Sequence, residues 1–320
     1  MQLQTNIHMT YPDGPKTPPV CSSADVIAEY DMRELAIQFL QCSSRKRREG
    51  LLGSRNEKPE PGPLHLYKYR SLNVKDEESI SKARSILVHD RIWAASPGSL
   101  NDPKDMRFKL SLNQDLDTRK RWVKVNAHLL PKSSPAQRLL RQQQLVRAGM
   151  TPEMELRFKQ EMELNIGVFC ASTDPRNQLL WAHYAAEHRG ICIQLSPFED
   201  ELFLIAKKVI YSKKFPTLVV PTPPGAKQEY YLHKSTDWAY EKEWRVVLPF
   251  NGCSISLRPL AISAVILGAR IENKTIAAVM GLLQERERSG KPPLKIYQAK
   301  LDEESFDINI LRHDGRTVAH

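Results

Sequence analysis

From residue 64 onward the sequence consists of short apolar segments, separated by turn-forming residues and by stretches of helical period. Apolar segments this short are typical of β-strands. We predict strands at 64–70, 91–95, 166–172, 191–195, 208–212, 243–249, 254–257, 264–267, 294–300 and 306–311, and helices at 76–89, 176–188 and 275–289. Because few of these strands alternate with helices in β-α-β units, the sequence predicts an α+β fold with a mixed sheet.

This strand-rich region, residues 64–312, is expected to form one main domain. Before it we predict a disordered tail at 1–20 and, within 21–63, a helix at 24–41 followed by a basic, Pro-rich linker. After it comes a tail at 313–320. Inside it we predict a basic helical insertion at 104–164, a Pro-rich loop at 216–225 and a short helix at 228–234.

The positive charge of the chain is concentrated in the insertion. The sequence has 47 Lys and Arg residues against 37 Asp and Glu residues, a net charge of +10. Residues 104–160 contain thirteen basic and five acidic residues, a net charge of +8. A basic segment of this kind suits an anionic macromolecule such as a nucleic acid.

Several classes of protein are disfavoured by what the sequence lacks. No window approaches about 18 uncharged apolar residues, so we expect no membrane-spanning helix. The N-terminal residues do not resemble a secretory signal. The five cysteines are scattered and form no C-x-x-C pair, so we expect no metal site and a cytoplasmic location. The glycine-rich motifs of P-loop nucleotidases, Rossmann dehydrogenases and α/β-hydrolases are absent.

The first candidate site segment alternates aromatic and basic residues. On a strand, Tyr67 and Tyr69 share one face, and Lys68 and Arg70 share the other. Two neighbouring aromatic rings predict a surface on which a planar ligand stacks. The alternative is a half-buried edge strand with no ligand.

Two further segments could line a pocket. The segment from Ser96 ends in Asn101-Asp102-Pro103, and such a turn lines a pocket or satisfies only its own backbone. In a helix over 176–188, His183 and Tyr184 lie on one face. The alternative for that aromatic patch is ordinary core packing.

The last segment, Trp238–Arg245, combines aromatic and charged residues. If a strand starts by Glu241, then Glu241, Glu243 and Arg245 point the same way. An exposed ion-paired strand face would explain these charges, but three aromatic residues surround the two carboxylates. Aromatic walls desolvate a carboxylate and strengthen its effect on a nearby cation.

Six motifs occur in order along the chain: L-Y-K-Y-R-S-L, S-x-x-x-L-N-D-P, F-C-A-S, L-L-W-A-H-Y-A with H-R-G-I-C-I, W-x-Y-E-K-E-W-R and A-V-I-L-G. This order resembles a bacterial family catalogued as domain of unknown function 2971. The resemblance covers about residues 64–300, interrupted by the basic insertion. The family name carries no activity.

Part of the pattern is also similar to the ADP-ribosyltransferase superfamily, whose fold holds NAD between two small packed sheets. The resemblance implies a split mixed sheet and NAD as substrate. It implies Glu243 as the catalytic carboxylate, with Glu241 orienting the acceptor or Glu243 itself. The residues it implies for NAD binding are Tyr67, Tyr69, Arg70 and Ser96, and those that shape the pocket are Asn101, Asp102, His183, Tyr184, Trp238 and Arg245.

Three hypotheses for function follow. The first is a cytoplasmic, NAD-dependent ADP-ribosyltransferase-like effector of the toxin or phage-defence type. The second is a nucleic-acid-binding protein or nuclease that uses the basic segment 104–160. The third is a non-catalytic interaction module whose aromatic clusters are core. The enzyme hypothesis requires Glu241, Glu243, Tyr67 and His183 to converge on one pocket.

Overall fold

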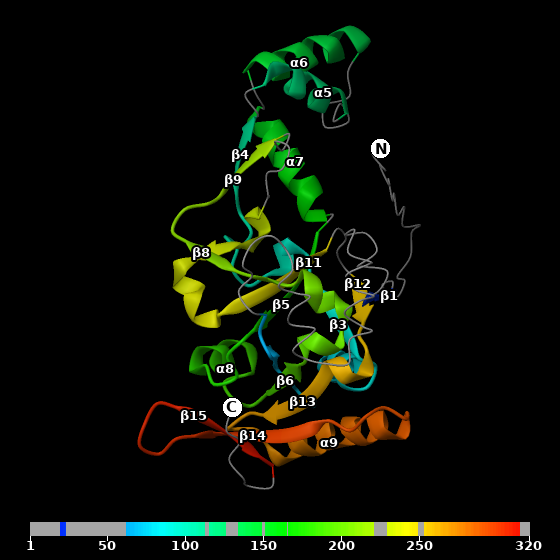
Figure 1. The fold of residues 1–320 in the computed structure, drawn as a ribbon, viewed down its shortest axis with the longest axis vertical. Helices are drawn as coiled ribbons and strands as arrows, with labels where there is room; N and C mark the ends of the chain where they lie inside the picture. Colours follow the sequence, from blue (N-terminus) through cyan, green and yellow to red (C-terminus); the bar gives the residue numbers. More distant parts are fainter. Residues whose placement is uncertain are drawn as a thin grey trace.

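The computed structural model describes residues 20–23, 62–112, 115–125, 134–148, 151–164, 166–220, 229–248 and 253–313. Its largest element is an eight-stranded sheet with the order β15-β14-β13-β6-β2-β5-β11-β7 (Figure 1). These strands are β2 (Leu66–Arg70), β5 (Gly167–Ser172), β6 (Ile191–Leu195), β7 (Lys207–Lys208), β11 (Glu243–Leu248), β13 (Ile262–Leu267), β14 (Lys295–Leu301) and β15 (Ile308–Arg312). The pair β13–β14 is parallel and the other pairs are antiparallel. Together with the helices, this mixed sheet confirms the predicted α+β class.

Three smaller sheets surround it. In the first, β12 (Cys253–Ser256) lies between β1 (Val20–Ser22) and β3 (Arg91–Ala94). The other two pair β8 (Ile210–Ser212) with β10 (His233–Ser235), and β4 (Lys109–Leu112) with β9 (Thr217–Val220). The predicted helix at 24–41, the linker after it and most of both tails lie outside the described residues.

The β4–β9 pair corrects two predictions. Residues 216–225 were expected to form a loop and residues 104–164 a helical insertion, yet each segment contributes one strand to this parallel pair. Proline cannot donate to a β-ladder. Here Pro216 precedes β9 without interrupting it, and the carbonyl of Pro216 accepts a hydrogen bond from the amide of Lys109 at 2.8 Å. The partner strand, more than 100 residues earlier, overrides the local Pro content.

Most predicted helices are present with shifted ends. They are α4 (Glu77–Leu87), α5 (Leu116–Val125), α6 (Pro135–Ala148), α7 (Pro152–Leu164), α8 (Gln178–Tyr184) and α9 (Asn273–Arg288), with short 3-10 helices at Pro97–Ser99, Pro197–Glu199, Glu201–Ile205, Tyr230–Leu232, Thr236–Glu241 and Pro259–Ala261. The helix expected at 228–234 is only the turn Tyr230–Leu232, because the chain then enters β10. The strand expected at 208–212 is divided between β7 and β8.

Both faces of the main sheet are covered. Along β6, Ile191, Ile193 and Leu195 join the larger core cluster, to which α4 and α9 contribute, while Cys192 joins a second cluster with Trp181 of α8. This alternation is the period-2 pattern of a strand whose two faces are both buried.

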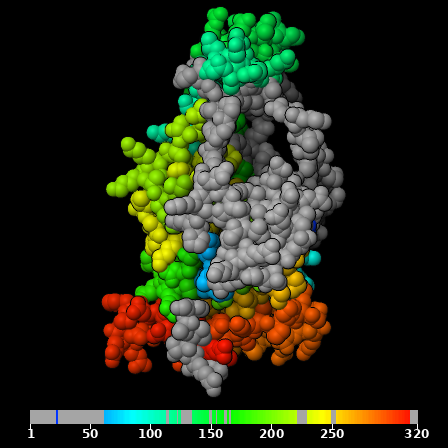
Figure 2. Space-filling model, in the orientation of Figure 1, coloured from blue at the N-terminus to red at the C-terminus, as the bar shows by residue number. Residues whose placement is uncertain are grey.

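Helices α5 and α6 lie at one end of the molecule, opposite α9, β14 and β15 (Figures 1 and 2). They are therefore remote from the part of the main sheet where the sequence motifs meet. Among the residues that the structure describes, no helix has the length and apolar character needed to cross a membrane.

Candidate active site

The main sheet splits along one edge of β5. At one end of this edge Ser172 pairs with Tyr67 of β2, and at the other end Val168 forms an isolated antiparallel bridge with Ala95, just after β3. The bridge consists of two hydrogen bonds, of 2.9 Å and 2.8 Å. In the described chain, the stretch 169–171 between these points pairs with neither strand, so β2 and β3 diverge from the same edge.

A cavity of about 310 Å³ lies in this wedge. The free edge of β5 forms its floor, and β2 and β3 form its walls. Its lining residues are Tyr67, Lys68, Tyr69, Arg70, Ile86, Trp93, Ala95, Ser99, Leu100, Asn101, Asp105, Val168, Phe169, Cys170, Ala171, Ser172, Leu180, Tyr184, Lys234, Glu241 and Glu243. A cavity of this size accommodates a small ligand or one half of a dinucleotide.

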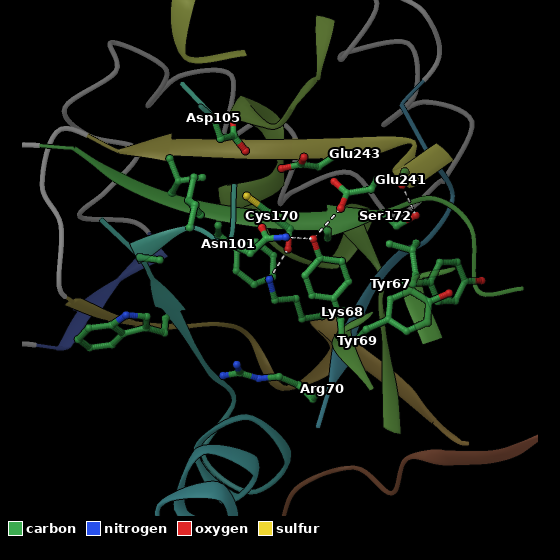
Figure 3. Close-up of a pocket in the computed structure, with 18 of the residues that line it drawn as sticks. Tyr67, Lys68, Tyr69, Arg70, Asn101, Asp105, Cys170, Ser172, Glu241 and Glu243 are labelled. Atoms are coloured by element: carbon green, nitrogen blue, oxygen red, sulfur yellow. Dashed lines mark hydrogen bonds between the residues drawn. The ribbon is translucent and has the colours of Figure 1, made fainter. Parts of the chain in front are cut away.

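The carboxylates of Glu241 and Glu243 lie at one side of the cavity (Figure 3), and both pair with the ammonium group of Lys234. The Lys234 Nζ atom forms an ion pair with Glu241 Oε2 and lies 3.0 Å from Glu243 Oε2. It also lies 3.5 Å from Asp105 Oδ2 and 5.0 Å from the centre of the Trp238 ring. All four charged groups are buried.

Arg245 binds two of these carboxylates, those of Glu243 and Asp105. Its Nε atom donates to Glu243 Oε1 at 2.7 Å, and its Nη2 atom donates to Asp105 Oδ2 at 2.7 Å. The Nη1 atom donates to the carbonyl of Tyr231 at 2.8 Å. The side chain of Arg245 is completely buried, which rules out an exposed ion-paired strand face. We call Asp105, Lys234, Glu241, Glu243 and Arg245 the cavity cluster.

The backbone brings Glu241 and Glu243 together although only Glu243 lies in a strand. Glu241 ends the 3-10 helix Thr236–Glu241, and Lys242 adopts a left-handed conformation with φ of 46°. The carbonyl of Glu241 accepts a hydrogen bond from Ser172 Oγ at 2.6 Å, and the carbonyl of Tyr240 accepts one from Asn177 Nδ2 at 2.8 Å. The segment after β5 therefore fixes the position of Glu241.

Tyr184 links Glu241 to the Asn101 turn. Its hydroxyl donates to Glu241 Oε1 at 2.7 Å and accepts from Asn101 Nδ2 at 2.8 Å. This chain of hydrogen bonds joins three segments that are distant in the sequence. It fixes Glu241 Oε1, the oxygen that does not pair with Lys234, at the cavity wall.

Two glycines explain how α8 approaches β2 closely enough for this contact. A Cβ atom on Gly190 would lie 2.2 Å from the carbonyl oxygen of Arg70, and one on Gly268 would lie 2.2 Å from that of His188. Larger residues therefore do not fit at either position. The helix predicted over 176–188 ends early, at Tyr184, because Ala186, Glu187 and His188 all have positive φ.

The two glutamates of the cavity cluster have opposite pKa shifts. Burial raises the pKa of Glu241, although Lys234 and Tyr184 oppose that rise. Burial also acts upward on Glu243, but Arg245 and Lys234 outweigh it and lower the pKa of Glu243 to about 2. Burial, reinforced by the hydrogen bond to Glu241, raises the pKa of Tyr184. Glu243 is thus a fixed anion, and Glu241 is the group suited to exchange a proton.

The cavity brings together seven of the twelve residues predicted for the site: Tyr67, Tyr69, Arg70, Asn101, Tyr184, Glu241 and Glu243. Ser96, Asp102, His183, Trp238 and Arg245 are not among its lining residues. Arg245, itself a member of the cavity cluster, and Trp238 contact other members of the cluster from outside the cavity. His183 is exposed on α8. Of the four residues whose convergence the enzyme hypothesis required, Glu241, Glu243 and Tyr67 therefore meet in the cavity and His183 does not. The Asp102 side chain accepts from the amide of Lys104 at 2.8 Å, as a turn residue does.

The two tyrosines of β2 are largely core residues. Tyr67 and Tyr69 are 5% and 6% exposed, and the Tyr69 ring packs edge-on against Trp181 at 5.1 Å. The Tyr69 hydroxyl donates to the carbonyl of Asp174 at 2.6 Å. Because β2 is a central strand, the edge-strand alternative is wrong. Stacking of a ligand on these rings remains a prediction.

Sequence reasoning missed Lys234 and Asp105 as members of the site. Lys234 lay in a segment expected to be helical, and Asp105 lay inside the expected insertion. Lys68 was noted only as facing away from the tyrosines, but its Nζ atom points into the wedge and donates to the carbonyl of Cys170 at 2.7 Å (Figure 3). The alternation of Lys68 with Tyr67 and Tyr69 along the strand was the sequence pattern that could have indicated a role for Lys68 in the site.

Within the described part of the chain, no group of three or more His, Cys, Asp or Glu side chains is placed to hold a metal ion. The family model described as Protein of unknown function (DUF2971) matches residues 180–246. This match, which includes most of α8, Lys234 and the Glu241–Arg245 segment, supports the family resemblance. Comparisons with curated proteins and with solved structures found no match.

Proposed function

We propose that this protein is an NAD-dependent ADP-ribosyltransferase-like enzyme whose active site is the wedge cavity. The observation that carries the proposal is the placement of two buried glutamates, Glu241 and Glu243, in the same cavity as β2 and the end of β3. The proposed superfamily likeness calls for the same three contributions, from a first strand, a second strand and an E-x-E segment, around a split sheet.

The chemistry suits the charges. When the bond between nicotinamide and ribose breaks, its electron pair goes to the ring nitrogen, and nicotinamide leaves as a neutral molecule. The ribose carbon becomes an oxocarbenium-like cation, which the ionised Glu243 stabilises at short range. The acceptor nucleophile then bonds to that carbon, and its proton passes to Glu241. Arg245 and Lys234 hold the two carboxylates in position.

Labelled NAD tests the proposal. Purified protein is incubated with NAD and cell extract, and both transfer of label and release of nicotinamide are measured. We expect Glu243→Gln to lower the rate by about 10²–10³-fold, because it removes the fixed anion. Glu241→Gln should lower transfer more than nicotinamide release, because it removes the proton acceptor.

The matched control is Glu201→Gln. Glu201 is also a buried, ion-paired glutamate, with Arg258 Nε at 2.8 Å, but it lies outside the cavity. Its substitution should leave the rate unchanged. Equal rates for wild type and Glu243→Gln, or no NAD turnover by the wild type, would contradict the proposal.

A second candidate function is nucleic-acid binding through the insertion. Helix α6 contains Arg138, Arg141 and Arg147 and no acidic residue, and α5 packs beside it with Arg121 and Lys124 exposed. Binding to phosphates through such a surface weakens steeply with salt because counterions are released. A mobility shift with RNA and DNA from low to high salt tests it, and no shift at low salt would exclude it.

A further inference from the structure

The wedge cavity contains two cations that have no anionic partner in the described chain. Lys68 and Arg70 lie on the same face of β2 and line the cavity, and Figure 3 shows both pointing into it. Within the described residues, the Lys68 ammonium hydrogen-bonds to the carbonyl of Cys170 and lies 5.2 Å from the centre of the Phe169 ring, and it forms no ion pair. Among the described residues, Arg70 has no hydrogen-bond or ion-pair partner.

Three other cations in the interior do have anionic partners. Lys234, Arg245 and Arg286 are fully buried, and each forms an ion pair with at least one carboxylate. A cation that is removed from water without an anion is unfavourable. Lys68 and Arg70 are partly buried, and burial lowers the pKa of both, although Glu243 and Glu241, which form no ion pair with Lys68, oppose the shift of Lys68. A ligand anion in the cavity would remove that cost.

An aromatic residue lines the same cavity from the facing wall. Trp93, on β3, is 43% exposed although the neighbouring Ile92 and Ala94 are buried. Within the described residues its ring packs against no other ring. An indole exposed at a cavity wall presents a flat surface for a heterocyclic base.

We propose that Lys68, Arg70 and Trp93 form a nucleotide subsite, in which a base stacks on Trp93 and a phosphate or pyrophosphate group contacts Arg70 and Lys68. The planar guanidinium of Arg70 binds phosphate oxygens in a bidentate manner, and Lys68 adds a point charge. The subsite deepens the proposed function, since it assigns the substrate of the same cavity to the nucleotides. Its test needs binding alone.

Calorimetric titrations with ADP, adenosine and inorganic pyrophosphate separate the two halves of the subsite. We expect ADP to bind more tightly than either part. Arg70→Gln and Lys68→Gln should each weaken ADP and pyrophosphate by at least about tenfold and leave adenosine unchanged. Trp93→Ala should weaken ADP and adenosine and leave pyrophosphate unchanged, while Trp93→Phe retains most of the affinity.

Controls distinguish a binding role from a structural one. Arg91→Gln removes an exposed arginine of β3 outside the cavity and should bind all three ligands as the wild type does. Arg70→Gln should keep or slightly raise the wild-type melting temperature, because no ion pair is lost and an uncompensated charge is removed. Nucleotide-independent destabilisation by Arg70→Gln would overturn the assignment of Arg70.

The subsite and the proposed function can fail separately. If ADP binds as described but NAD is not cleaved, the subsite stands and the transferase proposal is wrong. If none of the three ligands binds at millimolar concentration, or if the variants bind ADP as the wild type does, the subsite is wrong. These binding results decide whether the subsite exists, whether or not the protein cleaves NAD.

Discussion

Two buried ionic clusters in this protein contain the same residue types but differ in their surroundings and in the role that we infer for them. In the cavity cluster, three carboxylates share the two cations Lys234 and Arg245, and one side faces the wedge. In the second, which we call the Asp90 cluster, Asp90 pairs with Arg286 and Lys291. None of its three members lines the wedge cavity.

The Asp90 cluster is saturated by backbone contacts. Arg286 donates to the carbonyls of Leu87 at 3.0 Å, Pro259 at 2.8 Å and Pro292 at 2.7 Å, in addition to Asp90. It therefore joins α9 to the end of α4 and to the segments around β12 and β14. The cavity cluster instead contains an excess of negative charge beside a space for a ligand. Satisfied donors indicate a structural role, whereas unbalanced charge at a cavity indicates a chemical one.

The largest expected effect is on the Asp90 cluster. Arg286→Met should lower the free energy of unfolding by about 3–5 kcal/mol, because it leaves Asp90 and three carbonyls without their main donor. Urea unfolding followed by circular dichroism measures this loss. A loss below about 1 kcal/mol would show that the cluster is not structural.

The next effect is the pH dependence of the stability that the cavity cluster contributes through Glu243. The folded-state pKa of Glu243, about 2, lies below its ordinary value of 4.5, so the unfolded chain binds this proton more tightly. The stability that Glu243 contributes is therefore present above about pH 4.5 and is lost as the pH falls toward 2, by about 3 kcal/mol in total. Urea unfolding between pH 5 and pH 3 should show a smaller acid-induced loss for Glu243→Gln. Parallel curves for the two proteins would contradict this.

Lys234→Met should have a smaller effect at neutral pH, about 2 kcal/mol, because Glu241 can take up a proton in place of the lost cation. The pKa of Glu241 is already raised by burial, so the folded state retains its proton to higher pH. The destabilisation should therefore shrink as the pH is lowered from 8 to 5. An equal loss at both pH values would show that Glu241 does not buffer the cluster.

The smallest effect belongs to the exposed pair between α4 and α9. Arg84 Nε lies 3.1 Å from Glu285 Oε2, and both side chains are more than 40% exposed. Arg84→Met should change the unfolding free energy by about 0–1 kcal/mol. It is the matched control for Arg286→Met, since both substitutions remove an arginine that joins the same two helices.

Local patterns predicted the parts of the site that depend on residue alternation. The spacing of Glu241, Glu243 and Arg245 indicated a common direction, and the structure brings these three side chains together. The residues that alternate with them, Trp244, Val246 and Leu248, pack in or against the larger core cluster. The left-handed turn at Lys242 was not foreseen, because Glu241 is held by contacts with residues distant in the sequence, including Ser172 at the end of β5 and Tyr184 of α8.

Long-range pairing explains what the sequence could not show. The split sheet implied by the superfamily resemblance stays a prediction. The divergence of β2 and β3 that the structure does contain depends on Ala95 and Tyr67 meeting the same edge of β5. No local pattern encodes that meeting. Likewise Asp105 looked like part of a basic insertion, since its partner Arg245 is 140 residues away.

The length of the free edge of β5 also sets the length of the cavity floor. Val168 and Ser172 anchor the two walls, and the four residue steps of extended chain from one to the other span about 13 Å. Because side chains alternate along a strand, inserting one residue here would reverse the faces of everything beyond it. Inserting two would preserve those faces and lengthen the floor by about 7 Å. Engineering this protein for longer or shorter ligands should therefore proceed in steps of two residues within β5.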